Sequence, residues 1–304
     1  MPFKSLFLVE KYFWVLCVAC TITGLLYPRP FTPIQNTVIL DCFLMGILFF
    51  TCLKIDFRTI LGQLRHYMFI LYISLLVLVV MPFFTYIVTT FLLPEFTLGF
   101  LILAAAPAGM AGGALSELCK GNTSLAISIT TVTSIACPLS IPPIVTFLSG
   151  RHTPPSILAK QSLMLVLFIF LPLILSQAVK KTFPRFIRNH SAYFTPLSIV
   201  SLCLLILGAM SKNSSIFLSQ IDKALQILAG VFFFSIFFHV AGFAAPIGRS
   251  IQDKVAVSVN MAYVNNGLAI VFAMTFFSDV PEAVLPAILI EFPMILCIVP
   301  LRYL

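Results

Sequence analysis

Three asparagines lie inside an apolar stretch near the end of the chain, in SVNMAYVNNGLAIVF. Asn260, Asn265 and Asn266 fall within seven residues, directly before Gly267. An amide side chain accepts through its oxygen and donates through its nitrogen, so the cluster can hold a cation, bond a solute or satisfy an unwound backbone. The alternative is structural, since asparagines also join helices through hydrogen bonds. Three in so short a stretch exceed what packing needs, and we interpret them as part of a binding site.

A second break is predicted at residues 107–113, in the apolar stretch LILAAAPAGMAGGALSELCKGN. A proline and three glycines should interrupt a helix there, and freed backbone groups cannot lie against lipid. Unpaired amides and a positive helix end would suit an anionic group, while carbonyls would suit a cation. Small residues also let helices pack closely, but the proline and the matching second break favour a functional site. The candidate substrate-binding residues are Pro107, Gly109, Gly112, Gly113, Asn265 and Asn266.

Ionisable residues inside apolar segments are few, and each is a functional hypothesis by default. Glu291 lies near the middle of PAILIEFPMIL. A carboxylate at such depth is neutral, paired or lining water, so it could exchange a proton or a cation. His239 is at least as readily a hydrogen-bonded interior histidine, and Asp41 lies close enough to the end of its segment to reach water.

The composition indicates an integral membrane protein. Of the 304 residues, 60% are hydrophobic and 9% are charged, and the mean hydropathy is +1.09. A soluble domain cannot cover its surface with so few charges, whereas repeated apolar runs of about 20 residues are typical of membrane-spanning helices. The net charge of +8 is explained by basic cytoplasmic loops. We therefore expect the lipid bilayer as a partner and no nucleic acid.

Prolines, glycines and charge clusters divide the chain into ten apolar segments, which predict an all-α polytopic protein with about ten transmembrane helices. Connections such as Lys120–Asn122 are very short, so neighbouring helices should run antiparallel. The segments cover residues 7–27, 35–53, 68–93, 97–118, 123–148, 157–179, 193–210, 224–246, 251–276 and 283–302.

The basic residues predict that both termini lie in the cytoplasm, because positive charge gathers in cytoplasmic loops. With the N-terminus inside, the outer side holds Arg29, Arg151, Lys160, Lys212 and Lys223. The cytoplasmic side holds Lys4, Lys11, Lys54, Arg58, Arg65, Lys120, Lys180, Lys181, Arg185, Arg188, Arg249, Lys254 and Arg302. Short loops fit a bacterial inner (plasma) membrane.

The two breaks fall in the fourth and the ninth segments, which predicts two repeats of five helices. Five is an odd number, so the second repeat enters the membrane from the opposite side and the repeats are inverted. Repeat one would cover about residues 1–150 and repeat two about 151–304, in a single transmembrane transporter unit. Two interrupted spans in corresponding positions point to a transporter's binding site.

The residues of both breaks resemble the signatures of the bile acid:sodium symporter family. The matching motifs are A-P-A-G-M-A-G-G in the fourth segment, K-G-N at Lys120–Asn122, Pro138 as the proline closing the fifth span, and N-N-G-L-A at Asn265–Ala269. They stand in the family's order at similar spacing. The resemblance implies a ten-helix fold with a panel domain and a core domain, two crossing broken helices in the core, and sodium-driven transport of organic anions.

The same resemblance implies which positions bind sodium, and most of them differ here. Family members use a Ser-Asn pair at the first break, a Ser and a Thr on the fifth helix, and a Glu and a Gln in the ninth. The retained threonine is Thr130 on the fifth helix, and Asn265 is retained beside the second break. The changed positions carry Gly112, Gly113, Ala126, Asn260 and Val264.

The loss of that carboxylate removes the charge that best offsets a dehydrated cation. We hypothesise that backbone carbonyls at the breaks hold the ion instead and that Glu291 supplies charge from a new position. The candidate ion-binding residues are therefore Thr130, Asn260 and Glu291. Sodium is the expected coupling ion, with no cofactor and no other metal.

We expect a secondary active transporter of organic anions that works by alternating access with cation symport. Proton coupling through Glu291, uncoupled carriage and efflux by a carrier of the same fold are alternatives, and a membrane ligand sensor is the alternative outside transport. The chain has no G-x-S-x-G, H-E-x-x-H or phosphate-binding glycine motif, so an enzyme is not expected. The sequence leaves the substrate, the direction of transport and the oligomeric state undetermined.

Overall fold

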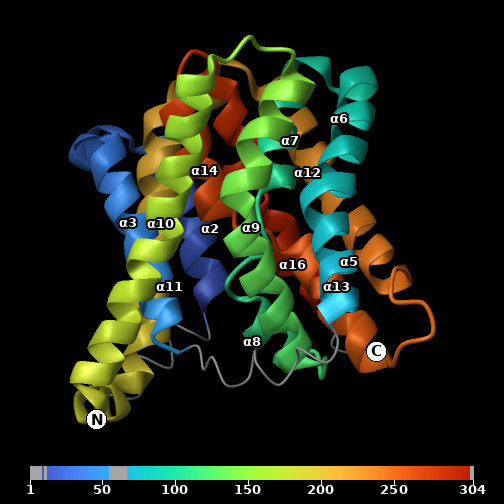
Figure 1. The fold of residues 1–304 in the computed structure, drawn as a ribbon. Helices are drawn as coiled ribbons and strands as arrows, with labels where there is room; N and C mark the ends of the chain where they lie inside the picture. The colour runs from blue at the N-terminus through green and yellow to red at the C-terminus, as the bar shows by residue number, and fades with distance from the viewer. Residues whose placement is uncertain (1–8, 10–11, 55–66, 302–304) are drawn as a thin grey trace. The chain divides into compact units, whose positions relative to one another are not determined.

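The computed structural model describes residues 9, 12–54 and 67–301, and helices make up most of this part of the chain (Figure 1). No strand occurs among these residues, although an isolated backbone bridge joins Ala108 and Val264. The predicted all-α class is confirmed. Five basic residues used for the orientation lie outside the described residues, as do parts of the first and tenth predicted segments. They are Lys4, Lys11, Arg58, Arg65 and Arg302.

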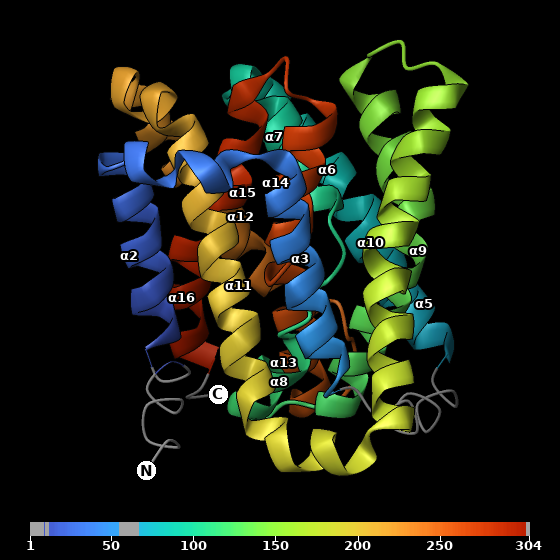
Figure 2. The same cartoon turned by 90° about the vertical axis from the view of Figure 1, so that its left-hand side faces the viewer.

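The chain divides into two compact units, and each combines two separate stretches. Unit 1 consists of the described parts of Met1–Ile55 and Met164–Ile221. Its elements are α2 (Phe13–Leu26), the 3-10 helix η1 (Arg29–Gln35), α3 (Thr37–Cys52), the later part of α10 (Pro155–Thr182) and α11 (Pro184–Ser219). Helix α11 lies between α2 and α3 (Figure 2). It buries Leu205, Ile206 and Met210.

Unit 2 consists of the described parts of Asp56–Leu163 and Asp222–Leu304. Its central helix is α7, which is buried along most of its length and packs against α6, α9, α14 and α15. The elements are α5 (Tyr67–Leu75), the π-helical turn η3 (Leu76–Val80), α6 (Met81–Leu92), the 3-10 helix η4 (Pro94–Phe96), α7 (Thr97–Ala105), α8 (Gly112–Leu118), α9 (Thr123–Ser149), the start of α10, α12 (Ile221–Ala244), α13 (Ile251–Ala262), α14 (Asn266–Phe276), the 3-10 helix η5 (Pro281–Val284), α15 (Leu285–Leu289) and α16 (Glu291–Leu301).

Six helices are long and apolar enough to cross a membrane by length and composition, and α2 with η1 would make a seventh despite a bend of 109°. The six are 67–92, α9, α10, α11, α12 and 281–298. Helices α3 and α14 and residues 94–105 are apolar but shorter. These helices identify an integral membrane protein. The total of ten spans, the inverted repeat and its division near residue 150 stay predictions.

In unit 2, residues of different loops that the sequence assigns to the same side of the membrane contact each other. Arg151 donates to Asp279 at 2.7 Å, and Lys223 pairs with Glu95, all four on the predicted outer side. The hydrogen bond from Arg151 holds the pKa of the Asp279 carboxyl below its usual range. On the predicted inner side, the Asn122 side chain donates to Asp253 at 2.8 Å. These contacts support the predicted alternation of helix direction within this unit.

Two predicted boundaries are wrong. Helix α11 runs over Pro184–Ser219 rather than 193–210. The basic residues that were taken to mark its ends belong to the helix itself, since long basic side chains can reach polar surroundings from a helix. Pro138 does not close the fifth helix. Helix α9 continues past it to Ser149, where Gly150 ends the helix in a left-handed conformation with φ of 65°.

Helices α2 and α11 approach closely at Gly24. A Cβ atom there would lie 2.9 Å from the Leu207 carbonyl oxygen and 3.1 Å from the Met210 Cβ. Small residues permit such backbone contact between membrane helices.

We expect Gly24→Val to destabilise unit 1 by about 2 kcal/mol, because the added side chain overpacks the α2–α11 contact. Ala19→Val is the matched control, since Ala19 is exposed on the same helix. Thermal unfolding of the purified protein can be followed through Trp14, the single tryptophan, which lies on α2. Equal melting temperatures for the two variants would contradict the packing role of Gly24.

Candidate functional site

Both predicted helix breaks are present in unit 2. Helix α7 ends at Ala105 and α8 begins at Gly112, so residues 106–111 separate the two halves. Helix α13 ends at Ala262 and α14 begins at Asn266. The interruptions lie where the proline, glycines and asparagines of the sequence predict them.

The two breaks contact each other through their backbones. The Gly109 amide donates to the Tyr263 carbonyl at 2.6 Å, and the Asn265 amide donates to the Pro107 carbonyl at 2.8 Å. These bonds flank the antiparallel bridge between Ala108 and Val264, which are both buried. Non-helical backbone at membrane depth is tolerated only where protein or a water-filled cavity shelters it. Here each break shelters the other.

The expectation of unpaired amides is wrong at three positions of the crossing. The Gly109 and Asn265 amides are bonded across the breaks, and the Ala108 amide donates to the Thr133 hydroxyl on α9 at 3.3 Å. The Asn265 side chain caps α14, because its oxygen accepts from the Leu268 amide at 3.1 Å. The sequence cannot reveal this pairing, since the acceptors come from distant parts of the chain.

Three oxygen atoms from different elements gather beside the first break. The Thr130 hydroxyl on α9 lies 2.7 Å from the Asn260 amide oxygen on α13 and 3.4 Å from the Gly109 carbonyl oxygen. The Asn260 nitrogen donates to Ala256 within its own helix at 2.8 Å, which turns the oxygen toward Thr130. Thr130 and Asn260 are 5% and 0% exposed. We call Gly109, Thr130 and Asn260 the oxygen cluster.

The two adjacent glycines of the first break have different surroundings. A Cβ at Gly112 would lie 3.0 Å from the Asn260 amide oxygen and 3.1 Å from the Thr130 hydroxyl oxygen. A Cβ at Gly113 would instead lie 2.7 Å from Cγ1 of Ile127. Gly112 therefore leaves room beside the oxygen cluster, while Gly113 lets α8 pack on α9.

Glu291 belongs to a second polar group. The Asn266 side chain, at the start of α14, donates to the Glu291 Oε1 at 2.6 Å, and Glu291 begins α16. Both side chains are buried. The structure gives Glu291 no hydrogen bond to Thr130 or Asn260. The candidate ion-binding residues thus divide between the oxygen cluster and the Asn266–Glu291 pair.

Two residues at the crossing, Thr133 and Tyr263, were not among the site residues predicted from the sequence. Thr133 accepts from the first break, as described above. Tyr263 accepts from Gly109 through its carbonyl, and its hydroxyl donates to the Met294 carbonyl at 2.5 Å, which ties the second break to α16. Its position between Asn260 and Asn265, in NMAYVNNG, was the available signal.

His239 has a structural role. Its Nδ1 lies 3.0 Å from the Ser258 hydroxyl, which also donates to the His239 carbonyl at 2.9 Å. These contacts hold α12 against α13. This geometry supports the interpretation of His239 as a hydrogen-bonded interior residue.

The chemistry of the oxygen cluster suits a hard monovalent cation. Its ligand atoms are neutral oxygens, and the described residues contain no group of three or more His, Cys, Asp or Glu side chains placed to hold a metal ion. Carbonyl oxygens of unwound helices coordinate sodium in transporters built this way.

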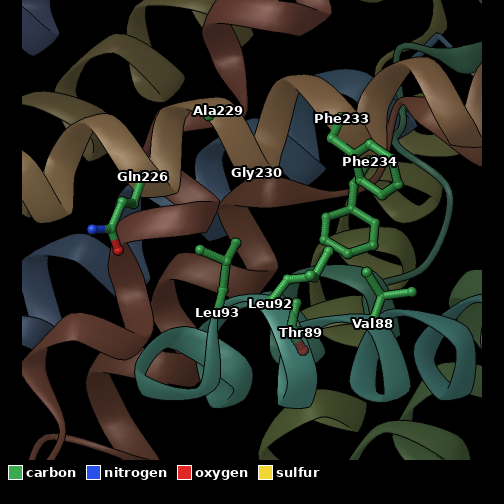
Figure 3. Close-up of a pocket in the computed structure, with 9 residues that line it drawn as sticks. All are labelled: Val88, Thr89, Leu92, Leu93, Gln226, Ala229, Gly230, Phe233 and Phe234. Carbon is green, nitrogen blue, oxygen red and sulfur yellow. The ribbon is translucent and has the colours of Figure 1, made fainter.

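A cavity of about 270 Å³ lies elsewhere in unit 2, between α6 and α12 (Figure 3). Figure 3 shows the Leu92 and Val88 side chains on one side and Phe233 and Phe234 on the other. The lining is mostly apolar and includes none of the residues of the crossing. We therefore do not place the site there.

Comparison with known proteins identifies the family. "Uncharacterized sodium-dependent transporter YocS" of Bacillus subtilis is 23% identical over 197 residues, which cover 62% of this chain and 60% of the relative. "Probable sodium/metabolite cotransporter BASS1, chloroplastic" of Arabidopsis thaliana is 22% identical over 193 residues, which cover 63% and 47%. The chain thus matches about half the length of these relatives. A model described as the SBF-like CPA transporter family matches residues 11–298, and the chain therefore belongs to this family of transporters.

Proposed function

We propose that this protein is a secondary active transporter that moves a small organic anion together with sodium, by alternating access around the two crossed breaks. The observation that carries the proposal is the buried oxygen cluster at the crossing, where Thr130 lies within 2.7 Å and 3.4 Å of two further oxygens from separate elements. Binding sites of secondary transporters typically lie at such interrupted helices.

Sodium fits the oxygen cluster as transported cargo. The Thr130 hydroxyl can rotate its proton away and present a lone pair beside the Gly109 carbonyl and the Asn260 amide oxygen. A divalent cation is not proposed, because calcium sites of proteins rely on carboxylates as well as carbonyls. The names of both relatives given above include sodium.

An organic anion is proposed as the substrate because the sodium site is neutral. A sodium ion held by three uncharged oxygens leaves a net positive charge in a buried place, where it strongly attracts a negative group. Binding of the ion would then favour binding of the anion, which is what symport requires. We place the anion beside Pro107, Gly112 and Asn266, in keeping with the resemblance to the bile acid:sodium symporter family.

We further propose that all ten apolar segments span the membrane, with each broken helix pair counted as one span. Units 1 and 2 would correspond to a panel domain and a core domain. Both termini would lie in the cytoplasm. Within unit 2, Arg151, Lys223 and Asn122 each contact a loop residue that is predicted to lie on the same side of the membrane. These contacts support helices that alternate in direction.

Thr130→Val tests the sodium site. Valine keeps the shape of the side chain but removes one ligand, so half-maximal uptake should require about tenfold more sodium, the equivalent of ~1.4 kcal/mol. The assay is uptake into vesicles of a labelled anion panel that includes a bile salt and small hydroxy acids, under a sodium gradient, a proton gradient or neither. Uptake by the wild type that never responds to sodium would reject the coupling.

Thr131→Val is the matched control for that experiment. The Thr131 hydroxyl bonds to the Ile127 carbonyl of its own helix at 2.8 Å and takes no part in the oxygen cluster. Uptake by the Thr131→Val variant should have the same sodium dependence as uptake by the wild type. Equal shifts in both variants would show a general effect on α9 rather than the loss of a ligand.

Gly112→Ala tests the space beside the oxygen cluster. The new methyl group would lie 3.0 Å from the Asn260 oxygen and 3.1 Å from the Thr130 oxygen, so it should hinder the ion and lower sodium-driven uptake at least several-fold. Gly46→Ala is the control, because its Cβ would meet the Ser201 hydroxyl at 3.1 Å in unit 1. Normal uptake by Gly112→Ala would place the ion elsewhere.

A further inference from the structure

Glu291 is the one buried carboxylate among the described residues of the chain. It is 4% exposed, whereas the other described Asp and Glu residues are half-buried or exposed. The oxygen cluster does not use it. A carboxylate held at this depth in a membrane protein is a functional-site hypothesis in its own right.

No positive charge compensates Glu291 in the described structure. The three ion pairs found there join other residues, and none of them includes Glu291. Asn266 on α14 donates to Oε1. Tyr263 is the titratable group of the second break that interacts electrostatically with Glu291, and its hydroxyl donates to the Met294 carbonyl. The other titratable groups around Tyr263 are Cys297, on the same helix as Glu291, Cys119, and His239, whose ring meets the Tyr263 ring edge to face.

The surroundings suit a proton better than a metal cation. A sodium ion needs several oxygens around it, but the side chain that faces Oε1 presents an N–H group, which a cation would repel. A proton needs a single oxygen, and protonation removes the buried charge. We propose that Glu291 takes up and releases a proton during the transport cycle, as a second ion-exchanging site in addition to the proposed sodium site.

The link to transport runs through Asn266, the first residue of α14. An N–H group bonds more strongly to a charged carboxylate than to a neutral acid, so the protonation of Glu291 changes how firmly the second break is held to α16. Transport would then respond to protons as well as to sodium. This step rests on the proposed function, while the proton site itself does not.

Infrared difference spectroscopy of the full-length protein in lipid tests the proton site without any substrate. As the pH falls, the wild type should gain the C=O stretching band of a protonated carboxylic acid, and Glu291→Gln should lose that band. Gln still accepts from Asn266, so the fold should be kept. Glu291→Asp should retain a band at a shifted frequency, and Glu117→Gln, at an exposed carboxylate of α8, should match the wild type.

Identical titrating bands in the wild type and in Glu291→Gln would overturn the inference. In vesicles at fixed sodium, wild-type uptake should vary with pH, and Glu291→Gln should lose this dependence while keeping its sodium requirement. The two failures are distinguishable. No uptake by the wild type would reject the proposed function and leave the infrared result standing, whereas an absent Glu291 band would reject the proton site even if sodium drives uptake.

Discussion

The structure of unit 2 depends on the need of interrupted backbone to find hydrogen-bond partners away from water. An unsatisfied amide in apolar surroundings costs several kcal/mol. Gly109 and Asn265 avoid this cost because each donates to a carbonyl of the opposite break. Neither break is satisfied alone, so the two must form together. The crossing of the broken helices follows from this exchange.

The same exchange positions the oxygen cluster. Pairing of Ala108 with Val264 fixes the register of the first break against the second, and Thr133 ties the first break to α9. One turn away along α9 and α13, Thr130 and Asn260 then meet beside the Gly109 carbonyl. Gly112 keeps room at this point, because a Cβ there would lie 3.0 Å from the Asn260 oxygen and 3.1 Å from the Thr130 oxygen.

Sequence reasoning predicted the breaks well because their causes are local. Proline, glycine and clustered asparagines disfavour a continuous helix wherever the rest of the chain lies. It could not assign partners, since the acceptor of the Gly109 amide is more than 150 residues away. The family resemblance named Thr130 and Asn260 as candidate ion-binding residues, but the sequence did not predict the hydrogen bond between them. The ends of α11 were misplaced because charge was taken as a helix boundary.

The charge balance of the buried interior connects these features to transport. Among the described residues, the interior holds one carboxylate, Glu291, and no buried lysine or arginine. Apart from Glu291, an interior of this kind has no fixed charge to neutralise an ion that enters it, and isolated charge in such a place is strongly disfavoured. Under the proposed function, a bound sodium ion and an organic anion would offset each other's charge, while a proton would neutralise Glu291. Coupling between transported species would then arise from electrostatics rather than from any single ligand.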